Sequence, residues 1–302
     1  MKFSIYQSSR QGGRKYNQDR VAYSYSKEAL LMVIADGMGG HLHGEVAAQI
    51  TVQMIAESFQ KQAAPVLSNP FDFLTEGIFA AHHAIGDYAV DHELLENPRT
   101  TCVACVIQGD AAYWAHVGDS RLYMFRGANL ISRTRDHSRV QQLFEDGKIT
   151  EEQMVTHPDR NKIYNCLGGM MPPEIEYSKK TPVREGDAFL LCSDGLWGEL
   201  TNNEIAAILQ TYPINQALPE LLDHAEFRGG EDGDNLSGVA MIWGDPTRLV
   251  QQDPVSTAAM PVDTFTTKMD TFDIPKEGGD VTEEDIERAI SEIQMAIKKY
   301  TK

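Results

Sequence analysis

The feature that most constrains the fold is the stretch from Leu30 to Glu45, which reads LLMVIADGMGGHLHGE. Its first six residues, 30–35, form a continuous apolar run, which is typical of a strand covered on both faces. The run ends at Asp36 and Gly37, and apolar residues recur four positions apart from Gly44 onward, as on the inner face of a helix. The stretch therefore predicts a buried strand, an acidic turn and a helix, with a carboxylate at the edge of the core.

The same arrangement of a carboxylate beside an apolar run occurs three more times. Asp194 follows DAFLLCS, Asp119 lies between two strand-like runs, and Asp234 precedes the last run. A single Asp-Gly pair most often marks only a tight turn. Carboxylates at several core-facing strand ends, however, repel one another when they come together, unless a cation neutralises them. The repeated pattern therefore predicts a divalent metal site.

Composition narrows the class of protein. With 302 residues and 42% hydrophobic residues, the chain can bury one large domain, or one domain with an appendage. The formal net charge of -17 disfavours binding to nucleic acid or to an anionic membrane, because both are recognised through clustered Lys and Arg. No apolar run approaches the roughly 20 residues of a membrane span, and the amino terminus lacks the apolar centre of a secretion signal. A cytoplasmic location is expected.

Two cysteines, Cys102 and Cys105, have the spacing of half a zinc site. Their surroundings, TTCVACVIQG, are strand-like, and residues three apart on a strand point to opposite faces. No second cysteine pair completes four ligands, so we interpret both as small buried residues.

The order of the predicted elements indicates an α+β domain, because helix pairs lie between strands and do not alternate with them one by one. Residues 1–245 are expected to form the catalytic domain, with a lid inserted at 136–169. Residues 246–280 are expected to be a linker, and 281–302 an amphipathic helix. That helix must bury its apolar stripe by docking on the domain, by self-association or by binding a partner.

Six motifs stand in a fixed order along the chain. They are RKYNQD at 14–19, ADGMGGH at 35–41, HVGDSR at 116–121, RDHS at 135–138, CSDGLW at 192–197 and GDN at 233–235. In this order and spacing they resemble the metal-dependent serine/threonine protein phosphatases of the PPM family, also called type 2C, in their bacterial form. The resemblance covers about residues 3–243.

The resemblance implies a fold and a metal centre. The fold is a four-layer αββα sandwich, with two central antiparallel sheets flanked by pairs of antiparallel helices. Two Mn²⁺ or Mg²⁺ ions lie in a cleft at one edge, with a third, weaker site. By motif, Asp36 would bridge the two ions, the Gly37 carbonyl would ligate one, and Asp194 and Asp234 would hold the other. Asp119 would serve the third site.

The resemblance also assigns roles to residues outside the metal ligands. Arg14 would bind the phosphate, and Asp19 would act near the ions through water. Many eukaryotic members have Glu where this chain has Gln18, and His where it has Met38. His41, three residues further on, is therefore only a candidate proton donor to the leaving oxygen.

Two classes of function follow from this reading. One is a phosphatase that hydrolyses phosphoserine and phosphothreonine by attack of a metal-bridging hydroxide, with no phosphoenzyme. Its partners would be phosphorylated proteins and a cognate serine/threonine kinase. The other is a regulatory module that binds phosphoproteins with little turnover.

Overall fold

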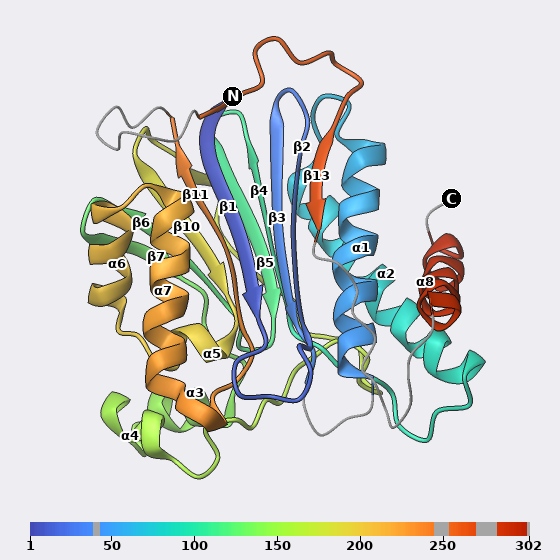
Figure 1. The fold of residues 1–302 in the computed structure, drawn as a ribbon, viewed down its shortest axis with the longest axis vertical. Helices are drawn as coiled ribbons and strands as arrows, with labels where there is room; N and C mark the ends of the chain where they lie inside the picture. Colours follow the sequence, from blue (N-terminus) through green and yellow to red (C-terminus); the bar gives the residue numbers. More distant parts are fainter. Residues whose placement is uncertain (39–42, 245–253, 270–282, 301–302) are drawn as a thin grey trace.

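The computed structural model describes residues 1–38, 43–244, 254–269 and 283–300. Two antiparallel sheets pack face to face, and helices cover the outer face of each (Figure 1). The predicted α+β class and four-layer sandwich are therefore confirmed.

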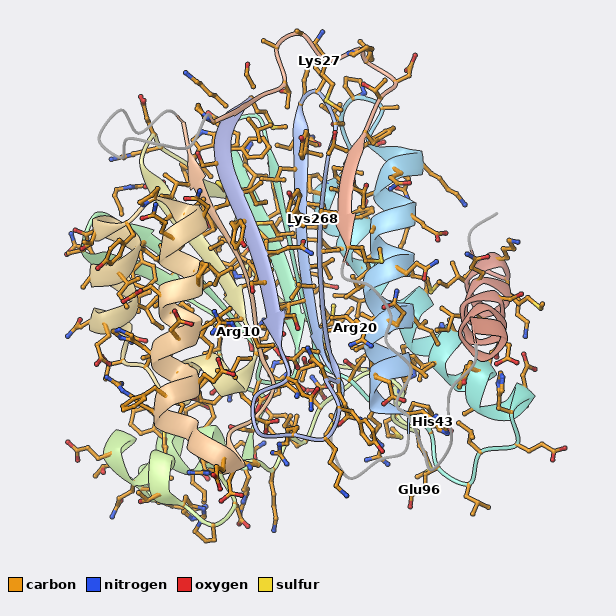
Figure 2. The ribbon with its side chains drawn as sticks, viewed as in Figure 1. Arg10, Arg20, Lys27, His43, Glu96 and Lys268 are labelled. Carbon is orange, nitrogen blue, oxygen red and sulfur yellow. The ribbon has the colours of Figure 1, made fainter. Side chains whose placement is uncertain are left out.

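The first sheet has the strand order β12-β1-β11-β10-β6-β7. Its strands are β1 (Lys2–Arg10), β6 (Arg121–Arg126), β7 (Asn129–Arg133), β10 (Asp187–Cys192), β11 (Leu236–Trp243) and β12 (Val255–Ser256). Its outer face is covered by α5 (Asp194–Trp197), α6 (Asn202–Thr211) and α7 (Ile214–Gly229), and η1 (Gly230–Asp232) leads into β11. Arg10 fixes α7 to this sheet, because its Nη1 contacts Asp223 and Glu226 at 2.6 and 2.8 Å (Figure 2).

The second sheet has the order β13-β2-β3-β4-β5-β8, with β9 also paired to β5. Its strands are β2 (Asp19–Tyr25), β3 (Ala29–Asp36), β4 (Cys102–Gln108), β5 (Ala111–Val117), β8 (Glu176–Tyr177), β9 (Thr181–Pro182) and β13 (Thr266–Met269). Its outer face is covered by α1 (Gly44–Gln62) and α2 (Pro70–Asp91). The Asn69 side chain caps the start of α2 by accepting a hydrogen bond from the Phe71 amide. Pro70 follows at the first helical position, where a backbone N–H would have no partner within the helix.

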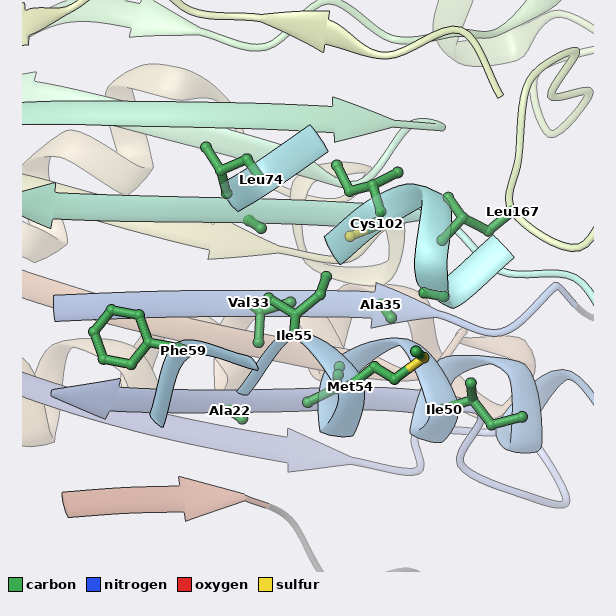
Figure 3. Close-up of a cluster of buried hydrophobic side chains, with 14 of the residues drawn as sticks. Ala22, Val33, Ala35, Ile50, Met54, Ile55, Phe59, Leu74, Cys102 and Leu167 are labelled. Atoms are coloured by element: carbon green, nitrogen blue, oxygen red, sulfur yellow. The ribbon is translucent and has the colours of Figure 1, made fainter. Parts of the chain in front are cut away.

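Alternation along the strands divides the apolar side chains between an inner core and two outer ones. On β3, Ile34 belongs to the core between the sheets, whereas Val33 and Ala35 pack against α1 and α2 (Figure 3). Cys102 and Cys105 are buried on opposite faces of β4, as predicted. β3 is apolar at every position from Ala29 to Ala35 because both of its faces are covered.

The predicted lid region, 136–169, connects the two sheets through two short helices, α3 (Arg139–Glu145) and α4 (Glu151–Thr156). Thr150 begins α4 with a capping box, since its side chain accepts a hydrogen bond from the Gln153 amide and the Gln153 side chain accepts one from the Thr150 amide.

The segment after β11 returns to the domain. The expected linker, in its described part, is not free of structure: β12 pairs with β1 and β13 pairs with β2, so it adds an edge strand to each sheet. Lys268 on β13 lies over the Tyr6 ring, 5.5 Å from its centroid (Figure 2). The last helix, α8 (Glu283–Lys298), lies outside α2. Among the described residues, no helix is both long and apolar enough to cross a membrane.

The core between the sheets holds the two halves of the sandwich together, and Phe189 on β10 is fully buried in it. We expect Phe189→Ala to lower the free energy of unfolding by about 3–5 kcal/mol, because it removes a large buried ring and leaves a cavity. Urea denaturation measures this change. Phe227→Ala is the matched control, because the Phe227 side chain is 89% exposed, and equal losses for the two variants would contradict the assignment.

Candidate metal centre

The centre is built by the antiparallel pairing, which brings strand ends to one rim. Asp19 begins β2 directly opposite Asp36, which ends β3. In the other sheet, β10 ends just before Asp194, and its neighbour β11 begins just after Asp234. Asp119 lies in the turn from β5 to β6, which joins the two sheets. Each of these five carboxylates is thus placed by a rigid strand end.

The carboxylates lie close enough to perturb one another. The pKa of Asp36 is raised well above its usual value, first by burial and then by the charges of Asp19, Asp194, Asp119 and Asp234. Burial and the charges of Asp234 and Asp19 raise the pKa of Asp194 to about 7. Burial likewise raises the pKa of Asp19 to about 6 and that of Asp119 well above its ordinary value. One mutually repelling cluster therefore contains all five predicted acids.

The cluster fits divalent cations. Asp19 Oδ1 and Asp119 Oδ1 are buried oxygens that accept no hydrogen bond from any residue the structure describes. Buried carboxylate oxygens without donors are costly, and an all-oxygen set suits hard ions such as Mg²⁺ and Mn²⁺. The donors present therefore match the cation class that the sequence predicts.

The turn after β3 is held from several sides. The Asp36 amide donates to Thr101 Oγ1 at 3.0 Å, and the Gly37 amide donates to the Gln18 carbonyl at 3.1 Å. A Cβ at Gly37 would lie 2.4 Å from the Gly44 backbone and 2.8 Å from the Gln18 carbonyl oxygen, so only glycine fits where α1 approaches this turn. The Gln18 side chain donates to Glu45 at 3.1 Å.

Arg14 lies beside the cluster and pairs with one of its members. Arg14 Nε and Nη2 donate to the two oxygens of Asp234 at 2.9 and 2.5 Å. The loop that carries Arg14 is fixed by Asn235, whose Nδ2 donates to the carbonyls of Gln11 and Tyr16 at 2.7 and 2.9 Å. The sequence analysis did not assign this role to Asn235. His41 lies outside the described residues.

Further polar contacts that the sequence analysis missed support the acids. Ser193 Oγ donates to Asp19 Oδ2 at 2.6 Å. Arg121 forms a two-pronged pair with Asp136 at 2.8 and 2.6 Å and lies over the Trp197 ring, 3.5 Å from its centroid. Three of the recognised motifs therefore meet in one buried contact.

A second cluster, of His116, His137 and Glu176, lies next to the turn of Asp119, and its potential ligand atoms lie within 4.8 Å of one another. His137 Nδ1 accepts from the Gly118 amide and from Asn165 Nδ2, so its proton is on Nε2, 3.4 Å from Glu176. His116 Nε2 donates to the Arg135 carbonyl at 2.7 Å. Burial lowers the pKa of both rings, that of His137 to about 3. A cation would require His137 to give up these contacts, so the aspartates form the better metal site.

Two stacked antiparallel sheets that hold carboxylates and Arg14 at a shared rim fit a metal-dependent hydrolase of phosphate esters. A family model described as Protein phosphatase 2C matches residues 7–226 of the chain. The chain belongs to this family and is a metal-dependent protein phosphatase.

Individual relatives agree. The serine/threonine phosphatase stp of Listeria welshimeri is 30% identical over 222 residues, which are 72% of this chain and 88% of that protein. A serine/threonine phosphatase structure from S. agalactiae is 31% identical, covers 80% of this chain and 99% of its own, and has a TM-score of 0.71. The catalytic domain of PstP, solved with two manganese ions, is 29% identical, covers 80% and 98%, and has a TM-score of 0.68.

Repulsion within the cluster makes a testable prediction for Asp194→Asn. In EDTA at pH 8, we expect the variant to unfold roughly 2–4 °C above the wild type, the shift that about 1 kcal/mol causes in domains of this size class. Because its pKa is raised, Asp194 holds its proton more tightly in the folded state than in the unfolded state. This difference stabilises the folded state below the ordinary carboxyl pKa, and the stabilisation is lost as the pH rises through about 7. The difference should therefore fade at pH 5.

Added Mn²⁺ should reverse the order, because the wild type gains stability from binding and the variant loses a ligand. Differential scanning calorimetry with and without Mn²⁺ makes the comparison. A variant that is less stable than the wild type in EDTA at pH 8 would contradict the repulsion.

Proposed function

We propose that this protein phosphatase removes phosphoryl groups from phosphoserine and phosphothreonine in proteins. The observation that carries the proposal is the meeting of Asp36, Asp194 and Asp234 with Arg14 at one rim of the sandwich. The relatives named serine/threonine phosphatases support the same substrate class. Phosphorylated proteins and the kinase that modifies them are the proposed partners, and a cytoplasmic location stays a prediction.

The metal ligands are proposed from the same cluster. Asp36 and the Gly37 carbonyl, together with Asp194 and Asp234, would hold two Mn²⁺ or Mg²⁺ ions, and Asp119 would hold a third. When bound, the ions supply a water of lowered pKa as the nucleophile and neutralise charge on the phosphoryl group.

The chain itself contributes binding and orientation. The planar fork of Arg14, which pairs with Asp234 in this structure, would suit two phosphoryl oxygens once a cation binds Asp234, and its loop is held in place by Asn235. Asp19, fixed by Ser193, would orient water beside the ions. A cysteine nucleophile is disfavoured, because burial raises the pKa of Cys102 to about 12 and raises the pKa of Cys105 and Cys192 as well.

The region 136–169 is proposed as a lid that selects substrates. Its base is closed, where Ser138 bridges Ile163 and Arg135 pairs with Glu145, and α3 and α4 lie at the lower end of the sandwich in Figure 1. Phe144 and Tyr164 are 40% and 45% exposed on it, so it offers apolar surface to a protein substrate.

Activity tests the proposal directly. We expect Asp36→Asn to lower kcat for Mn²⁺-dependent release of phosphate from a phosphothreonine peptide by about 100-fold or more, because it removes the proposed bridging ligand. Arg14→Ala should raise KM, and so lower kcat/KM, without abolishing the Mn²⁺ binding that calorimetry measures. Full activity in Asp36→Asn would reject the assignment. Stoichiometric peptide binding without turnover in the wild type would favour the regulatory module.

For the last helix, we propose that it docks on its own catalytic domain. Ile293 and Ile297 are buried in the core formed by the second sheet with α1 and α2. On α2, Asp91 is contacted by Lys299 at 2.7 Å, and Asp87 is contacted by Tyr300 at 2.8 Å. These contacts favour intramolecular docking over self-association or capture of a partner.

Ile297→Asp tests the docking, with Met295→Asp as its control because the Met295 side chain is 61% exposed. Placing a charge at the buried position should lower the melting temperature by several degrees and speed amide exchange in 283–300, whereas the control should change neither. Sedimentation that shows a concentration-dependent dimer, disrupted by Ile297→Asp, would instead support self-association.

A further inference from the structure

Arg99 lies next to the metal-binding turn by virtue of strand register. On β3 and β4, Ile34 pairs with Val103, and the same register continues beyond the ends of the strands. The Thr101 amide donates to the Asp36 carbonyl at 2.9 Å, Gly37 bridges Thr100, and the Met38 amide donates to the Arg99 carbonyl at 3.0 Å. Arg99 therefore stands opposite Met38, one pleat beyond the pair formed by Asp36 and Thr101.

The register also fixes the face on which Arg99 projects. Ile34 and Val103 point into the core between the sheets, whereas Ala35 and Cys102 point toward the helices. Side chains two residues apart share a face, so Thr101 and Arg99 follow Val103 on the inner face, as Asp36 follows Ile34. Thr101 fits this placement, because its Oγ1 contacts Ser120 Oγ at 2.7 Å, directly after Asp119.

The guanidinium of Arg99 is incompletely satisfied. Its Nε is buried and makes no hydrogen bond within the described part of the chain, and none of the described carboxylates lies within ion-pair distance of it. Arg121 and Arg126, by contrast, each bind both oxygens of one aspartate. The Cys166 thiol lies nearby, and Arg99 opposes the rise that burial causes in its pKa. A buried Nε without an acceptor is costly, and an anion that arrives with the substrate would supply that acceptor.

We propose that Arg99 is a substrate-binding residue that holds an anionic oxygen of the phosphoprotein at the rim of the candidate metal centre, on the side opposite Arg14. Arg14 belongs to the side of Asp234 and the first sheet, while Arg99 precedes β4 in the second sheet. A guanidinium recognises a phosphoryl group and a carboxylate through the same paired donors. The oxygen comes from the phosphoryl group itself or from an acidic residue beside it.

This inference rests on the proposed phosphatase function, and the experiment separates the two. The variants are Arg99→Met and Arg99→Lys, with Arg184→Met as the control. Arg184 is exposed, and it lies before β10 at the end of that strand remote from Asp194. The substrates are p-nitrophenyl phosphate and two phosphothreonine peptides that differ only in Asp or Asn beside the phosphorylated residue. Calorimetry of Mn²⁺ binding and a melting curve accompany each variant.

We expect Arg99→Met to raise KM about tenfold while Mn²⁺ affinity stays that of the wild type, and Arg184→Met to change neither. A rise for all three substrates assigns the contact to the phosphoryl oxygens, and a rise only for the acidic peptide assigns it to the carboxylate. Arg99→Lys, which keeps the charge but not the fork, should give a smaller rise and serves as the test if Arg99→Met does not fold.

Unchanged KM for all three substrates, with intact Mn²⁺ binding, would overturn the proposal. Absence of Mn²⁺-dependent turnover in the wild type would instead reject the phosphatase function. In that case, fluorescence anisotropy with the same labelled peptides still decides the role of Arg99, since loss of affinity in Arg99→Met supports it and equal affinity rejects it.

Discussion

Mutual repulsion among carboxylates is the constraint on which this structure depends. Burial makes it costly to ionise Asp36, and the charges of four other aspartates add to that cost. A flexible loop would relieve such repulsion by moving its acids apart. The strands cannot do so, because each acid stands at an end fixed by a ladder of backbone hydrogen bonds and by a buried core. The backbone hydrogen bonds and the buried core of the two sheets therefore hold the acids in place until cations neutralise them.

The same rigidity explains how the sandwich positions groups from distant parts of the chain. The register of β2 and β3 brings Asp19 opposite Asp36, and that of β10 and β11 brings Asp194 near Asp234. The core between the sheets then sets the separation of the two pairs. Asn235 links the first sheet to the second at this rim, because it donates to the Tyr16 carbonyl and accepts from the Gln18 amide in the loop before β2. The positions of the acids are thus set by side-chain packing in the core between the sheets, away from the metal centre itself.

Much of this could be predicted from the sequence because burial leaves a mark on it. A run such as Leu30 to Ala35 is apolar at every position since both of its faces are covered, and the acid that follows is conspicuous. The short strands β12 and β13 leave no such mark, because two to four residues at an exposed sheet edge need little apolarity. The partners of Arg14 and the face of Arg99 depend on register and on contacts over 60 or more positions, and no local pattern encodes them.

The net negative charge of the chain makes positively charged side chains at the rim important for binding an anionic substrate. A chain with a net charge of -17 repels an anionic phosphoprotein over a distance of about 8–10 Å at physiological salt. Cations held by the buried carboxylates would reduce the negative charge of the centre, but they would not reach beyond it. Arg14 and the proposed substrate contact at Arg99 would place positive charge at the edge of this cluster, where a substrate would meet it. Because a guanidinium also fixes the orientation of the anion that it binds, these residues can align the phosphate as well as attract it.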